Sequence, residues 1–170
     1  MAKRKTLVVV FSMGGNTRRV GEEVAHALGG QVDRLRDLAC KGGTWGYVTS
    51  VWRAMRRRTT VIDGADHDPG DYDLVVLGTP VWAGHVTPAM RTYVRDHRDR
   101  LPAVACFVTL GGTGPDKPLA ELAALTGKTP EATLFVNNKD RLEDRDRGKV
   151  LAFVDQLSGE DSPVSHAEVA

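Results

Sequence analysis

Short apolar runs alternate along this chain with segments in which apolar residues recur every three or four positions. The runs are rich in valine, which is typical of strands buried on both faces. We predict four such strands, at Thr6–Phe11, Leu74–Gly78, Ala103–Leu110 and Ala132–Val136. The segment Gln31–Leu35 alternates apolar and polar residues, so it is predicted to be an edge strand.

Helical periodicity between and after these runs predicts amphipathic helices. The first helix begins at Thr17, and a later one has Pro88 in its first turn, where proline is tolerated. The apolar faces are predicted at Val20, Val24, Ala27 and Leu28, at Val86, Met90, Tyr93 and Val94, at Leu119, Leu122 and Ala123, and at Val150, Phe153, Val154 and Leu157. Strands that alternate with such helices indicate parallel βαβ units, with helices on both faces of an open sheet.

Chain length, net charge and cysteine content limit the classes of protein to which this chain can belong. The chain has 170 residues, enough for one domain with its own core, which we expect to span residues 1–158 with a polar tail at residues 159–170. Its 23 basic and 22 acidic residues give a net charge of +1, so no general attraction to nucleic acid follows. Cys40 and Cys106 show no metal-ligand spacing, nor do the histidines, and Cys106 is expected to be a buried thiol. No run approaches the ~20 apolar residues of a membrane span, so we expect a soluble, cytoplasmic protein.

The loop after the first strand is rich in glycine and small polar residues. It comprises Ser12, Met13, Gly14, Gly15, Asn16 and Thr17. Its two glycines allow the backbone to approach a ligand closely, so that successive N–H groups converge on an anion at the start of a helix. The loop lacks the Gly-Lys-Ser/Thr of a nucleoside-triphosphate site and the Gly-x-Gly-x-x-Gly of a dinucleotide site. It therefore favours a single phosphate monoester; the alternative is an ordinary turn capped by Asn16 or Thr17.

Two further loops should meet the first one, because parallel strands end at the same edge of a sheet. The second comprises Thr79, Pro80, Val81, Trp82, Ala83 and Gly84, and the third comprises Leu110, Gly111, Gly112, Thr113 and Gly114. Trp82 is predicted at the tip of its connection, where it either stacks on a planar ligand or packs partly buried against the next helix. The third loop either offers N–H groups to the polar edge of a flat ring or is simply mobile. Asp116, just beyond it, is expected to cap a helix.

These residues resemble the flavodoxin-like FMN proteins, especially the flavodoxin-fold reductases of the NAD(P)H:quinone oxidoreductase type. The match runs from about Leu7 to Leu157 and is strongest at Tyr72–Gly84. It implies a flavodoxin-like three-layer α/β fold, with a doubly wound, five-stranded parallel sheet in the order 2-1-3-4-5. It also implies that FMN binds non-covalently, with its phosphate on the first loop and its ring between the second and third. Gly14 stands where many relatives carry a hydroxyl residue, so one phosphate contact would be absent.

The same resemblance covers enzymes and electron carriers, and the fold does not decide between them. The carriers are strongly acidic, whereas this chain is nearly neutral, which favours an enzyme. We therefore predict an oxidoreductase that passes electrons from NAD(P)H through FMN to a quinone or similar small-molecule acceptor. His85 is its one candidate catalytic residue, as a proton donor; otherwise it caps a helix or faces solvent. The alternatives are an electron-transfer protein that a separate reductase partner reduces, and an adaptor without flavin. The sequence does not decide whether the chain forms a homo-oligomer.

The segment Lys41–Arg58 is longer than a strand-to-helix connection needs. Val48, Val51, Trp52 and Met55 form an apolar stripe at helical spacing, and Arg53, Arg56 and Arg57 lie opposite it, with Arg58 next. We interpret the segment as a surface helix that packs its stripe on the sheet and exposes a solvated basic face. The alternative is a lid or partner helix, with Trp45, Tyr47 or Trp52 near the flavin and with arginines that bind the 2′-phosphate of NADPH.

Overall fold

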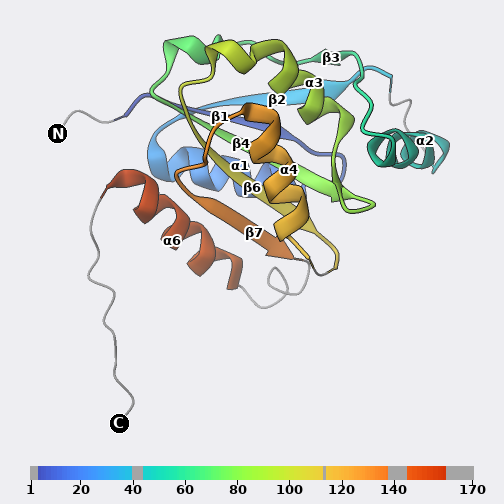
Figure 1. Cartoon of the computed structure of the whole chain (residues 1–170). Helices are drawn as coiled ribbons and strands as arrows, with labels where there is room; N and C mark the ends of the chain where they lie inside the picture. Colours follow the sequence, from blue (N-terminus) through green and yellow to red (C-terminus); the bar gives the residue numbers. More distant parts are fainter. Residues whose placement is uncertain (1–3, 40–43, 113, 138–144, 160–170) are drawn as a thin grey trace.

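Five parallel strands form the centre of the structure, a computed structural model that describes residues 4–39, 44–112, 114–137 and 145–159 (Figure 1). The strands are β1 (Thr6–Phe11), β2 (Gln31–Asp37), β4 (Leu74–Trp82), β6 (Ala103–Leu110) and β7 (Thr133–Asn137). They lie in the order β2-β1-β4-β6-β7, and each neighbouring pair is parallel. Counted among themselves, these strands have the predicted order 2-1-3-4-5, which is confirmed.

Two short antiparallel strands extend this sheet. β3 (Ile62–Asp63) pairs with β2, and β5 (His85–Val86) folds back on the end of β4. Ala83 and Gly84 connect β4 to β5 with φ angles of 50° and 77°, as a type I′ hairpin turn requires. Val86 therefore lies in a strand. The prediction that it belongs to the following helix is wrong, because the hairpin is completed before that helix begins.

Helices cover both faces of the sheet (Figure 1). α1 (Asn16–Leu28) and α6 (Arg145–Ser158) pack on one face, and α2 (Thr44–Met55), α3 (Pro88–His97) and α4 (Asp116–Thr126) pack on the other. Short 3₁₀ turns, Pro69–Asp71 and Arg98–Arg100, precede β4 and β6. The three-layer α/β fold is thus confirmed. None of the helices within the described ranges is both long and apolar enough to cross a bilayer.

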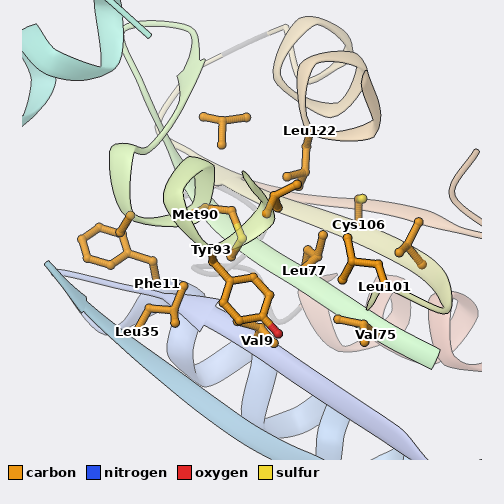
Figure 2. Close-up of a cluster of buried hydrophobic side chains, with 14 of the residues drawn as sticks. Val9, Phe11, Leu35, Val75, Leu77, Met90, Tyr93, Leu101, Cys106 and Leu122 are labelled. Atoms are coloured by element: carbon orange, nitrogen blue, oxygen red, sulfur yellow. The ribbon is translucent and has the colours of Figure 1, made fainter. Parts of the chain in front are cut away.

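The core cluster beneath α3 and α4 contains Tyr93, the largest of the fully buried side chains (Figure 2). Met90 and Tyr93 of α3 are fully buried against it, together with Leu77 of β4 and Cys106 of β6. Burial raises the pKa of the Cys106 thiol to about 12, so this thiol stays neutral. The prediction that Cys106 is buried is confirmed, whereas Cys40 lies outside the described residues.

The opposite core cluster joins α1 and α6 to the other face of the sheet. Val20, Val24 and Leu28 of α1 are buried there, as predicted. Ala27 is exposed, so its predicted place on the buried face is wrong. The buried stripe of α1 includes Ala25 instead, because that side of the helix faces the sheet.

Most of the apolar stripe of α2 faces solvent rather than the sheet. Val48, Trp52 and Met55 are 51%, 48% and 57% exposed, whereas Gly46 and Ala54 are buried. Val51, the fourth residue of the stripe, is partly buried and packs against the core. The interpretation that the stripe packs on the sheet is therefore wrong for Val48, Trp52 and Met55 and holds for Val51 alone. α2 approaches the core through Val51 and through the small residues Gly46 and Ala54.

Two of the arginines after α2 contact this stripe. The guanidinium carbons of Arg56 and Arg58 lie 4.3 and 6.0 Å from the centre of the Trp52 ring. At an exposed site, such a cation–π contact stabilises by roughly 0.5–1 kcal/mol. The prediction that Arg56 lies opposite the stripe is wrong, because its guanidinium lies over the Trp52 ring. The side chains of Trp45, Tyr47 and Arg53 lie outside the described part of the structure.

Candidate functional site

A cavity of about 300 Å³ lies where β1, β4 and β6 end, and we call it the edge cavity. Its lining residues are Ser12, Met13, Gly14, Asn16, Thr17, Pro80, Val81, Trp82, Thr109, Leu110 and Gly111. The three loops predicted to meet do so here, because their parallel strands share one carboxyl edge. Polar and glycine residues line the side towards α1, and larger apolar residues line the side formed by β4.

The polar side of the edge cavity is the start of α1. Gly15 is the N-cap residue with φ 83°, and no side chain caps the first turn. Asn16 and Thr17 are the first two helical residues, so the alternative in which one of them caps the helix is wrong. Backbone N–H groups and the partial positive charge of the helix start therefore lie beside the cavity, where an anion is stabilised.

A buried hydroxyl pair fixes this helix start to the sheet. The Oγ1 atoms of Thr17 on α1 and Thr109 on β6 are 2.7 Å apart and form a hydrogen bond. Thr109 lines the edge cavity although the sequence analysis did not select it. The signal that could have found it is its position directly before the third loop, with a hydroxyl group on a strand that is otherwise apolar.

Trp82 forms part of the apolar wall. It is the last residue of β4 and only 6% exposed, and its ring meets that of Phe11 edge-on at 5.6 Å. The prediction that Trp82 sits at the tip of the connection is wrong, because Ala83 and Gly84 form the turn. Packing against β1 holds the indole ring in place while it still lines the edge cavity.

The family of the chain follows from comparison with known proteins. A family model for the flavodoxin domain matches residues 40–142. The chain belongs to the flavodoxin domain family. No curated protein matches it significantly in sequence.

Solved structures of flavodoxin-like proteins share the fold. One is a flavoprotein in complex with FMN from Lactobacillus acidophilus, with a TM-score of 0.69 and 18% identity, covering 84% of this chain and 97% of that one. A protein from Bacteroides eggerthii, proposed to be a flavoprotein, has a TM-score of 0.69 and 22% identity, covering 88% and 98%. A flavodoxin, WrbA-like protein from Agrobacterium tumefaciens has a TM-score of 0.55 and 14% identity, covering 89% and 96%. At these identities the likeness shows the flavodoxin-like fold.

Not every predicted site residue of this flavodoxin domain lines the edge cavity. Thr79 is buried, and its hydroxyl oxygen lies 2.8 Å from that of Thr87 and donates to the carbonyl of Pro80 at 3.0 Å. This side chain therefore braces the connection from β4 to α3. Other predicted residues that do not line the cavity are Gly15, Ala83, Gly84, Gly112 and Gly114. Thr113 lies outside the described residues.

His85 faces α4 instead of the edge cavity. Its Nδ1 lies 3.1 Å from Oε2 of Glu121, and Arg91 of α3 forms an ion pair with Oε1 of the same carboxylate. All three side chains are largely buried. Burial alone would raise the pKa of Glu121, but hydrogen bonds from Arg91 and His85 outweigh it, so its pKa is lowered. The carboxylate therefore stays ionised and holds His85 in place.

Two other features concern capping and metals. The expected cap at Asp116 does not form: this residue is the first of α4, Pro115 precedes it as N-cap, and no side chain caps the helix. Among the described residues, no group of three His, Cys, Asp or Glu side chains is placed to hold a metal ion.

Proposed function

We propose that this flavodoxin domain binds FMN in the edge cavity and passes electrons from NAD(P)H to a quinone or similar small acceptor. One observation carries the proposal: an uncapped helix start, a glycine-rich loop and the Trp82 wall line a single cavity. Bound FMN supplies the redox chemistry by accepting electrons from one partner and releasing them to another. The near-neutral net charge of +1 supports an enzyme over a carrier steered by charge.

The residues of the cavity suit the two ends of FMN. The N–H groups at the start of α1 are donors for a phosphate monoester, and the hydroxyl of Ser12 adjoins them. Pro80, Val81 and Trp82 form an apolar wall that excludes water from one side of a flat ring. The backbone at Gly111 is the candidate donor to the polar edge of the ring.

An anaerobic reduction experiment tests the function. The purified chain is loaded with FMN, freed of excess flavin and mixed with NADPH or NADH while the visible absorption of the flavin is recorded. We expect rapid bleaching without any other protein. Bleaching that requires an added reductase would assign the chain to the electron carriers instead. Loss of the colour together with the excess flavin would rule out FMN binding.

Substitutions at Gly14 test where the phosphate lies. A Cβ atom at this position meets nothing within 4 Å, and φ is not in the left-handed region, so side chains fit without strain. Gly14→Ser should tighten FMN binding by about 0.5–1.5 kcal/mol, because it adds a hydroxyl donor. Gly14→Asp should weaken binding by at least about 1 kcal/mol, because it adds a negative charge beside the phosphate. Isothermal titration with FMN measures both, and Gly14→Ala is the control. Equal affinities for all variants would place the phosphate elsewhere.

Trp82→Ala tests the ring wall. If the flavin stacks on this indole, FMN affinity should fall by about 1–3 kcal/mol, measured by fluorescence titration. The change also removes the contact with Phe11, so thermal unfolding must show that the variant is folded at the temperature of the titration. Trp82→Phe keeps an aromatic face and should lose less affinity. A folded Trp82→Ala variant with unchanged FMN affinity would remove Trp82 from the site.

A further inference from the structure

A second cavity, of about 440 Å³, lies between α3 and α4, and we call it the α3–α4 cavity. Its lining residues are Arg57, Arg91, Lys117, Ala120, Glu121, Ala124 and Leu125. The five residues from α4 recur at intervals of three and four, so they form one face of that helix. Ala120 and Ala124 leave room on this face that longer side chains would fill.

Positive charge dominates this cavity. Arg57 follows α2, Arg91 lies on α3 and Lys117 lies on α4, so three separate elements each contribute a cation. Glu121 is the one carboxylate in the lining, and it already binds Arg91 and His85. Within the described ranges, neither Arg57 nor Lys117 has a carboxylate within ion-pairing distance, and Nε of buried Arg91 has no hydrogen-bond partner. The cavity therefore has more positive charge than its own carboxylate neutralises.

The backbone around Arg57 and Lys117 also shapes this cavity. Arg57 has φ 51°, a conformation that residues other than glycine seldom adopt. It lines the α3–α4 cavity, whereas Arg56 and Arg58 lie over the Trp52 ring. Lys117 lies in the first turn of α4, whose helix start carries a partial positive charge. The partial charge of the α4 start favours an anion beside Lys117.

The β4–β5 hairpin links the two cavities. Trp82 lines the edge cavity, and its partner across the hairpin, His85, binds Glu121 in the wall of the α3–α4 cavity. A molecule that reacts in the edge cavity could therefore extend past the hairpin and place a charged group among these cations. This link rests on the proposed function of the edge cavity.

We propose that the α3–α4 cavity binds an oxyanionic group, phosphate or carboxylate, of the redox co-substrate. Guanidinium and ammonium groups from different elements suit the several oxygen atoms of such a group. The source is either the reductant, through the 2′-phosphate of NADPH, or an acceptor that carries a carboxylate.

Binding of inorganic phosphate tests the subsite without any redox activity. The full chain, with FMN added to occupy the edge cavity, is titrated with phosphate at constant ionic strength, and backbone amide NMR signals are followed. We expect saturable shifts at Ala120 and Ala124. In the double variant R57Q/K117Q, phosphate affinity should fall at least about tenfold, because two charge-assisted contacts are removed.

Two controls sharpen this result. Lys128→Gln removes a lysine charge just beyond the C-terminal end of α4, away from the residues that line the cavity. It should leave phosphate affinity unchanged. Ala124→Leu fills the cavity but keeps every charge, and it should weaken phosphate binding. The absence of saturable shifts, or equal affinity in wild type and the double variant, would overturn the subsite. If FMN fails to bind, the same titration without flavin still tests the α3–α4 cavity, because the amides of the edge cavity and of α4 give separate signals.

Steady-state kinetics identify the source of the oxyanion. For the double variant, a KM for NADPH raised at least about tenfold with an unchanged KM for NADH assigns the subsite to the 2′-phosphate. A raised KM for a carboxylated naphthoquinone, but not for its uncharged parent, assigns it to the acceptor. If none of these KM values changes, the assignment to a co-substrate is wrong even where phosphate binds.

Discussion

Glu121→Ala is expected to lower the free energy of unfolding by about 3–5 kcal/mol. The carboxylate is 11% exposed and binds Arg91, which is 8% exposed, together with His85. Without it, the Arg91 guanidinium keeps its charge in a largely buried place with no carboxylate to neutralise it. Glu121→Gln, which keeps an oxygen acceptor but loses the charge, should cost less. Urea unfolding followed by circular dichroism measures both variants.

The exposed pair between Arg4 and Glu131 is the matched control. Its side chains are 37% and 42% exposed, so Glu131→Ala should cost only about 0.2–1 kcal/mol, because water screens the charges. If Glu121→Ala costs no more than this control, the buried cluster does not stabilise the fold.

The stability contributed by Glu121 should also depend on pH. Its pKa in the folded chain lies below the ordinary value of 4.5, so the native state stabilises the ionised form. The contribution is therefore fully present above about pH 4.5 and is lost as the pH falls through the lower, folded-state pKa. The difference in unfolding free energy between wild type and Glu121→Gln should stay constant near neutral pH and shrink in acid. A difference that grows in acid would contradict the lowered pKa.

Gly78→Ala is expected to lower the free energy of unfolding by about 3 kcal/mol. Gly78 on β4 lies opposite Phe107 on β6, and the Phe107 ring covers the glycine so closely that a Cβ atom would overlap the ring carbons. The ring is fully buried, so it has no free space into which to move. Thermal unfolding and urea titration measure the loss.

A double variant separates this clash from other effects. Gly78→Ala combined with Phe107→Leu should cost less than the sum of the two single changes, because the smaller side chain makes room for the methyl group. Gly148→Ala in α6 is the control: nothing lies within 4 Å of its Cβ position, and it should stabilise the helix by roughly 0.5–1 kcal/mol. Strict additivity of the double variant would contradict a direct clash between these two residues.

The strands were predictable because a strand that is buried on both faces appears in the sequence as a short run of apolar residues. β1 and β6 begin and end at the predicted residues, Thr6–Phe11 and Ala103–Leu110, since each is an apolar run with a single threonine. β4 is longer than the predicted Leu74–Gly78 because its next two residues still pair with β6 and its last two pair with β5 in a hairpin. That pairing depends on a turn conformation at Ala83–Gly84, which apolar periodicity does not report.

The stripe of α2 shows the limit of periodicity. Spacing places Val48, Val51, Trp52 and Met55 on one side of a helix, but of these only Val51 packs against the core, and the other three face solvent. Amphipathic spacing says which residues share a face. It does not say which face meets the sheet, because contact between elements depends on their shapes as well as on hydrophobicity.

The sequence by itself determined the order of strands and helices, the three loops that meet at one edge of the sheet, and the glycine-rich start of α1. Each of these follows from residues that are neighbours along the chain. Only the tertiary structure decided which residues line each cavity, that Thr109 pairs with Thr17, and that His85 binds Glu121. Those contacts join side chains 92 and 36 positions apart, and they form only when the sheet brings separate helices and strands together.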